Sequence, residues 1–150
     1  PAVNTPQFGW VKSRLKNKAQ PVPPIYEPEV IADAVTWVTD HYRRELFIGL
    51  NTAIIIQGNK VFPALGDRYL GKTGYKSQQT NEPANPNRPN NVWEPVDETR
   101  DYGAHGAFDK QAKRKSRQLW VDTHPGVLAL AGSAGLLGIA GGVALFRKLQ

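Results

Sequence analysis

The chain has 150 residues with no cysteine and no methionine, and its formal net charge is +6. This length permits one modest domain, and the absence of cysteine excludes disulfide frameworks and thiolate metal sites. The basic residues do not accompany a recognisable nucleic-acid-binding module or aromatics placed for base stacking, so we expect no nucleic-acid partner. A solvated basic surface and an anionic lipid surface both remain open as explanations of the charge.

The first residue is proline rather than methionine, so we expect the chain to be a segment of a longer protein or a processed remnant. Its composition predicts three parts. Residues 1–76 hold most of the periodic apolar patterns that a folded domain needs. Residues 77–124 are predicted to be an extended arm, rich in Pro and Asn, that ends in a basic segment. Residues 125–150 are predicted to be a membrane anchor.

Two helices are predicted in the first part of the chain. The stretch 7–15 presents Phe8, Val11 and Leu15 at spacings of three and four, as one face of a short helix does. The prolines that follow favour an extended connector. A second, amphipathic helix of about three to four turns is predicted to begin at Pro28, because proline suits the first helical position.

The apolar run 46–48 is predicted to be a short buried strand that ends at Gly49. A strand needs a partner for its backbone hydrogen bonds, so we expect the other strands of its sheet to lie outside these residues. The following stretch predicts a helix pair that is interrupted at Pro63. Farther along, Trp93 and Phe108 are predicted to anchor the polar arm.

In chain order, the segments PAVNT, FGWVKSRL, YEPEVIADAVTWV and HYRRELFIG resemble the C-terminal third of a short-chain dehydrogenase/reductase. In that family, a strand-ending turn with a Thr holds the nicotinamide and its phosphates, and a substrate-loop helix follows. A helix of the PEEVA type and a last strand then complete the sheet. The continuation through KTGYKSQQTNEP and NNVWEP is similar to long C-terminal extensions in a bacterial branch of the family.

The resemblance implies an α/β fold in which the chain is the C-terminal fragment of a doubly wound Rossmann-type sheet. This fragment would have one strand plus helices, an irregular extension and a C-terminal transmembrane-like helix. The resemblance also implies that Val3 and Thr5 bind the cofactor, NAD or NADP, and that Phe8 and Trp10 belong to the substrate loop. Packing of the loop on the sheet is the alternative role for these two aromatic side chains.

The implied reaction is hydride transfer between a nicotinamide and an alcohol or carbonyl substrate. The chain lacks the family's Gly-rich loop, its catalytic Ser and its Tyr-x-x-x-Lys pair, so we expect no catalytic residue in it and no turnover by it alone. The implied partner is an upstream Rossmann half that supplies these groups. The alternative is a non-enzymatic, membrane-anchored interaction protein derived from a dehydrogenase remnant.

The three histidines, His41, His105 and His124, are widely spaced and have no acidic cluster beside them in the sequence, so we expect them to be solvated and to form no metal site. Residues 127–146 contain no charged side chain. A helix of that length reaches about 30 Å, which predicts a membrane anchor with the catalytic part in the cytoplasm. Within it, Gly138 and Gly142 form a GxxxG pair that would permit a homo-oligomer.

Overall fold

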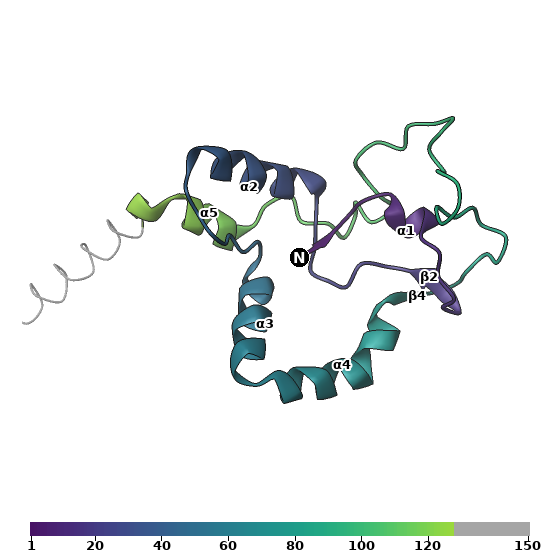
Figure 1. Ribbon diagram of the computed structural model, residues 1–150, viewed down its shortest axis with the longest axis horizontal. Coiled ribbons are helices and arrows are strands. Elements are labelled where there is room, and N and C mark those ends of the chain that lie inside the picture. The colour runs from purple at the N-terminus through teal and green to yellow at the C-terminus, as the bar shows by residue number, and fades with distance from the viewer. Residues whose placement is uncertain (128–150) are drawn as a thin grey trace, which may run out of the picture. The chain divides into compact units, whose positions relative to one another are not determined.

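The computed structural model describes residues 1–127. The chain divides into two units, Pro1–Ser116 and Arg117–Gln150 (Figure 1). The described part of the second unit includes the helix α5 (Arg117–Thr123). The first unit contains, in order, β1 (Ala2–Val3), α1 (Gln7–Trp10), β2 (Asn17–Ala19), β3 (Ile25–Tyr26), α2 (Pro28–Asp40), α3 (Leu50–Val61), α4 (Pro63–Ser77) and β4 (Gln79–Pro83).

The centre of the first unit is a small parallel sheet. β1 pairs with β3, so that Ala2 lies opposite Ile25. The far edge of β3 is extended by Lys113, whose N–H donates to the Ile25 carbonyl at 2.9 Å and whose carbonyl accepts from the N–H of Glu27 at 3.1 Å. Both side chains of β3 are buried. Residues from the start and from the end of the unit therefore meet at β3.

A second pair of strands brings the polar arm back to the beginning of the chain. β2 and β4 are antiparallel, and the amide of Asn17 donates to the Thr80 carbonyl at 2.9 Å. An ion pair between Lys18 and Glu82, with 2.6 Å between nitrogen and oxygen, lies across the same strands. The segment that follows residue 76 is therefore attached to the first part of the chain by strand pairing. The predicted boundaries at residues 76 and 124 stay predictions.

The helix α2 begins where the sequence predicts, with Pro28 in its first turn and Glu29 beside it. It buries Val30 and Ala34, which are four residues apart and so lie on one face. Val35, which the apolar pattern places near that face, is exposed. At the end of the helix the ring of His41 stacks on Trp37, with 4.1 Å between centroids.

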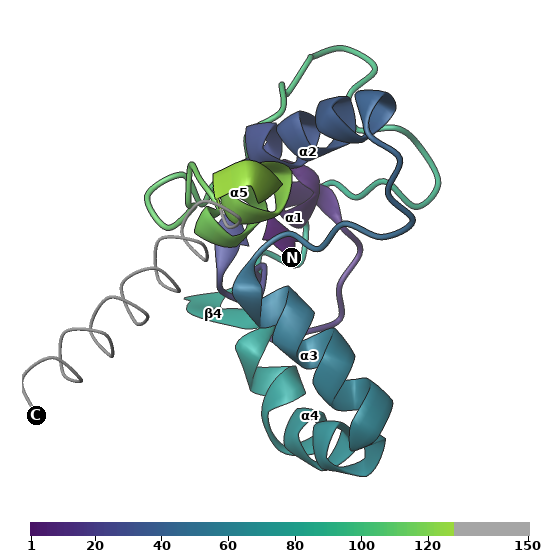
Figure 2. The ribbon, with the colours of Figure 1, turned by 90° about the vertical axis from the view of Figure 1, so that its left-hand side faces the viewer.

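The predicted interrupted helix pair is confirmed. α3 ends at Val61 and α4 begins at Pro63, because proline cannot continue the hydrogen-bond ladder of the preceding helix. Gly49 precedes α3 with a φ of 87°, a left-handed conformation that favours glycine. Figure 2 shows α4 following α3, and Figure 1 shows that the two helices run at a wide angle to each other. Neither helix has a buried residue. The large exposed apolar side chains on the two helices and at the junction between them include Ile54, Ile55, Phe62, Leu65 and Leu70.

The predicted Rossmann-type fragment is wrong for the described residues. Each sheet there has two strands, and no doubly wound sheet is formed. The run 46–48 is not a strand, because within residues 1–127 it has no neighbouring strand with which to share backbone hydrogen bonds. The first predicted helix is also shorter than expected. It ends at Trp10, and the next residue is already extended, with a ψ of 133°.

The prediction of a membrane-anchored protein is also corrected. Among residues 1–127, no helix is long and apolar enough to cross a bilayer. The longest of these helices, α4, has 15 residues and carries Asp67, Arg68, Lys72 and Lys76. Its length is about 22 Å, whereas the hydrocarbon core of a bilayer is about 30 Å thick. Apart from residues 125–127, the predicted anchor lies outside the described residues, and so does its GxxxG pair.

Candidate functional site

The turn that follows β1 is held by a fully buried side chain, Asn4, with an exposed fraction of 0%. Its amide Nδ2 donates to a carboxylate oxygen of Asp109 at 2.6 Å, and its Oδ1 accepts from the N–H of Phe108 at 3.0 Å. Its backbone N–H donates to the Tyr26 carbonyl at 2.9 Å. Asn4 therefore fixes the turn after β1 to both β3 and the segment 105–109.

A glycine allows the same two segments to approach closely. The N–H of Gly106 donates to the Asn4 carbonyl at 3.2 Å. A Cβ on Gly106 would lie 2.4 Å from the carbonyl oxygen of Thr5 and 2.7 Å from Oδ1 of Asn4. Non-bonded atoms cannot remain at these distances, so only glycine fits here without a shift of the backbone.

The two predicted cofactor residues lie at this turn. Val3 is the second residue of β1, and its carbonyl accepts from the N–H of Thr5 at 3.0 Å. Both side chains are half-buried. The hydroxyl of Thr5 forms no hydrogen bond within residues 1–127, so its donor and its lone pairs are free to bind a ligand. Binding of NAD or NADP by these residues stays a prediction.

A large cavity, of about 1010 Å³, lies beside the turn. One predicted substrate-loop residue, Phe8, lines it together with Phe108, and their rings meet edge to face with 6.0 Å between centroids. The prediction that Phe108 anchors the arm is confirmed by this contact. The cavity exceeds the usual volume range for small-molecule sites only slightly, so it can hold a substrate of moderate size.

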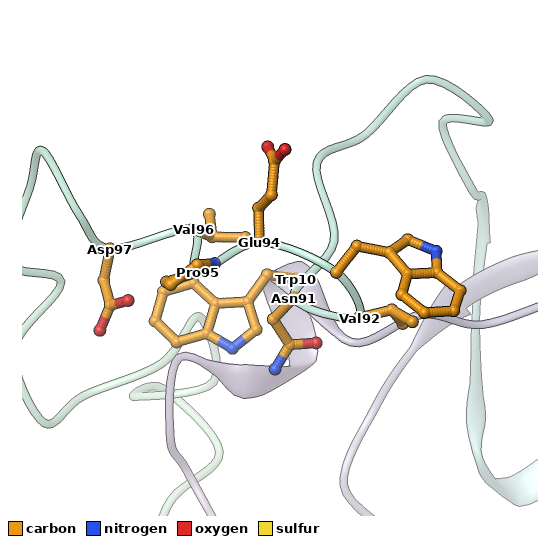
Figure 3. Close-up of a pocket in the computed structure, with 8 residues that line it drawn as sticks. Trp10, Asn91, Val92, Glu94, Pro95, Val96 and Asp97 are labelled. Carbon is orange, nitrogen blue, oxygen red and sulfur yellow. The ribbon is translucent and has the colours of Figure 1, made fainter.

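The other predicted substrate-loop residue, Trp10, lines a different and smaller cavity, of about 380 Å³. The loop 91–97 forms the rest of its wall, and Figure 3 shows the indole of Trp10 beside Pro95. The N–H of Asn91 donates to the Trp10 carbonyl at 3.2 Å, and the Tyr102 ring packs edge to face on the indole at 4.7 Å. Trp10 therefore packs on the arm rather than on the sheet, and its place in a substrate loop stays a prediction.

The prediction that Trp93 anchors the arm is wrong, because this residue is 91% exposed. The anchoring ring is that of Tyr102, nine positions later, which packs on Trp10. The sequence could not distinguish the two, because both are isolated aromatics in a polar stretch. The choice between them depends on which ring reaches α1 in the folded chain.

His105 lies between two carboxylates at the rim of the large cavity. Its Nε2 is 2.8 Å from Glu29, and its Nδ1 is 3.3 Å from Asp109. These contacts raise the pKa of His105 above its ordinary value of 6.5, with the hydrogen bond to Glu29 as the largest cause. The pKa of Glu29 is lowered from 4.5, first by its backbone hydrogen bond and then by His105. Sequence reasoning missed this cluster because Glu29 lies 76 positions before His105, although Asp109 is only four positions after it.

The cluster makes stability depend on pH. A raised pKa means that His105 contributes fully below about pH 6.5 and loses its contribution as the pH rises through the raised value. Glu29 contributes above about pH 4.5 and loses its contribution as the pH falls through the lowered value. We therefore expect His105→Ala to destabilise the protein more at about pH 5.5 than at about pH 9. Urea unfolding at the two pH values measures this difference.

The matched variant is Glu29→Gln, which keeps the shape of the side chain and removes its charge. The pH at which the His105 imidazole titrates, followed by nuclear magnetic resonance, should then fall toward 6.5. An equal loss of stability for His105→Ala at both pH values would show that the pairing has no effect on folding.

No group of His, Asp and Glu side chains within residues 1–127 is arranged to hold a metal ion. All three histidines are exposed, as expected, although each ring also has a partner within the protein. His41 and His124 stack on tryptophans four residues earlier, and each ring nitrogen Nδ1 contacts the carbonyl of its tryptophan. His105 is the histidine with acidic neighbours, although no acidic cluster stands beside it in the sequence.

No known protein-family profile matches the chain, and no solved structure matches it either. One curated protein does, the "Uncharacterized oxidoreductase YxnA" of Bacillus subtilis (strain 168). The two are 37% identical over 62 residues, which is 41% of this chain and 17% of the relative. The chain therefore spans about a sixth of the length of that relative. Over this part of its length, it is similar to an oxidoreductase.

Proposed function

We propose that the chain is the C-terminal part of an NAD(P)-dependent oxidoreductase of the short-chain dehydrogenase/reductase type. The bound nicotinamide would supply or accept the hydride in the interconversion of an alcohol and a carbonyl. An upstream part of the protein would provide the catalytic Tyr and Lys and most of the cofactor contacts. The similarity to an oxidoreductase supports the reaction class.

The observation that carries the proposal is the hydroxyl of Thr5, which has no hydrogen-bond partner within residues 1–127 and immediately precedes a residue of the large cavity wall. Thr5 is followed at once by Pro6, and Pro6 and Phe8 both line the large cavity. A cofactor held at Thr5 would therefore lie next to the space in which a substrate fits. The half-buried position and the absence of a partner within residues 1–127 both suit a side chain that hydrogen-bonds a ligand.

The residues of this chain would position and enclose the reactants. The Thr5 hydroxyl would hydrogen-bond the nicotinamide side of the cofactor, and Asn4 keeps the Thr5 backbone in place through its contacts with Tyr26 and Asp109. Phe8 and Phe108 form an apolar wall that excludes water from one side of the cavity. Orientation of two reactants is a large part of enzymatic rate enhancement.

In the whole protein, Thr5→Ala should weaken cofactor binding by about 2- to 12-fold, the effect of losing one hydrogen bond of 0.5–1.5 kcal/mol. Thr5→Ser keeps the hydroxyl and should bind the cofactor nearly as the parent protein does. Fluorescence titration with NADH and with NADPH measures the affinities, and circular dichroism melting measures stability.

Unchanged affinity in Thr5→Ala together with a lower melting temperature would assign Thr5 a purely structural role. Failure of the whole protein to bind either dinucleotide would favour a non-enzymatic interaction protein. The 150-residue chain alone is expected to bind neither dinucleotide measurably, because Val3 and Thr5 provide only a small part of such a site. Micromolar affinity of this chain would contradict that placement of the site.

A further inference from the structure

The large cavity is lined by four basic side chains, and two of them are already neutralised. Lys18 is paired with Glu82 at 2.6 Å. His105 lies between Glu29 and Asp109, so the carboxylates beside it offset its positive charge. The other two are Arg88 and Arg100.

The two arginines form no ion pair within residues 1–127. The Nη2 of Arg88 donates to the Val11 carbonyl at 2.7 Å, which holds this guanidinium without offsetting its charge. The guanidinium of Arg100 lies 5.0 Å from the centre of the Tyr102 ring, and an aromatic face also leaves the cation's N–H groups available. Both side chains therefore keep donors and positive charge at the cavity wall.

The same cavity has an apolar side. Phe8 and Phe108 line it, and the edge-to-face contact of their rings fixes the orientation of both. A ligand that suits the whole cavity combines an apolar or aromatic body with an anionic group. Guanidinium groups prefer planar or tetrahedral oxyanions, because their fixed N–H forks match carboxylate and phosphate oxygens.

We propose that the cavity selects substrates that carry an oxyanion group, a carboxylate or a phosphate, on an apolar body. Arg88 and Arg100 would bind the oxyanion, while the phenyl rings contact the body. The inference deepens the proposed function, since it names the class of alcohol or carbonyl compound that the site would take. Every residue that lines this cavity lies within the first unit.

Two probes that differ in a single group test the proposal. Phenylpyruvate is an aromatic 2-oxo acid, and phenylacetone has the same skeleton with a methyl group in place of the carboxylate. Titration calorimetry with the whole protein, without dinucleotide, should show that phenylpyruvate binds at least about tenfold more tightly. Phenyl phosphate is the third probe, and its affinity relative to benzoate distinguishes a phosphate site from a carboxylate site.

The test variant is Arg100→Gln, which removes the charge but keeps a long polar side chain. It should weaken phenylpyruvate binding about tenfold and leave phenylacetone binding unchanged within about twofold. Arg88→Gln should weaken phenylpyruvate binding to a similar extent. Arg88→Lys keeps a positive charge at this position, so it separates the effect of the charge from the effect of the hydrogen bond to Val11. The matched control is Arg68→Gln on α4, since Arg68 is exposed and does not line the cavity.

The outcomes separate this inference from the proposed function. The oxyanion site would be overturned by equal affinity for phenylpyruvate and phenylacetone. It would also be overturned if Arg100→Gln and Arg68→Gln had equal effects on phenylpyruvate binding. Either result would stand even if the protein oxidises NADPH with neutral ketones. Arginine-dependent binding of the anionic probes, without oxidation of NADH or NADPH by any probe, would leave the site standing and contradict the oxidoreductase function.

Discussion

Gly106→Ala is expected to lower the free energy of unfolding by about 3 kcal/mol, the upper part of the range for overpacking a close contact. The new methyl group would lie 2.4 Å from the Thr5 carbonyl oxygen and 2.8 Å from the Thr5 carbonyl carbon. Both are backbone atoms, so no side-chain rotation can relieve the contact. The turn after β1 must move, and in the whole protein this displacement should also weaken cofactor binding.

The control for Gly106→Ala is the same substitution at Gly71 in α4. A Cβ there meets nothing within 4 Å, and alanine is the better helix former by about 0.5–1 kcal/mol. The two variants should therefore shift stability in opposite directions. Urea unfolding followed by circular dichroism measures both, and a similar small shift for the two variants would show that the approach of residue 106 to the turn is not tight.

Asn4→Ala is expected to lower the free energy of unfolding by about 3 kcal/mol, because it removes a buried side chain that forms two hydrogen bonds. The N–H of Phe108 loses the acceptor that it meets at 3.0 Å, and Asp109 loses a donor at 2.6 Å. An unsatisfied buried group costs about 1–3 kcal/mol, and a hydrogen bond to a charged group contributes about 1.5–3 kcal/mol, less where water reaches the carboxylate.

A double-mutant cycle with Asp109→Ala isolates that one hydrogen bond, and we expect a coupling energy of about 1 kcal/mol. Asn87→Ala is the control, because Asn87 is exposed and its side chain forms no hydrogen bond within residues 1–127. This control should change stability by less than about 0.5 kcal/mol. If Asn4→Ala lost no more stability than Asn87→Ala, the hydrogen bonds of the Asn4 side chain would not be what holds the turn.

Local features of the fold could be predicted from the sequence. Pro28 marks the start of α2, and Pro63 separates α3 from α4, since each proline acts on the backbone within one turn of its own position. The helix expected over residues 7–15 stops at Trp10 even though its apolar spacing fits. The carbonyl of Val11 instead accepts from Arg88, 77 positions later in the chain, so a distant contact takes the place of the next helical turn.

The sheets and the site depend on contacts that no local pattern encodes. β3 meets both β1 and Lys113, and Asn4 meets Asp109, 105 positions away. The sequence left a substrate-loop role and a packing role open for both Phe8 and Trp10, and the structure places the two residues in different cavities. The cluster around His105 was missed because its partner Glu29 lies 76 positions earlier. Isolated polar residues carry no periodic signal that could reveal such a cluster.

The measurement that tests the central claim most directly is hydride transfer from a labelled cofactor. The whole protein would be incubated with NADPH or NADH deuterated at C4 of the nicotinamide on either face, together with phenylpyruvate or phenylacetone. The proposed function predicts that one cofactor and one label position transfer deuterium to the carbonyl carbon, seen by mass spectrometry as an alcohol product one mass unit heavier. Absence of deuterium from every product, with neither cofactor oxidised, would contradict it.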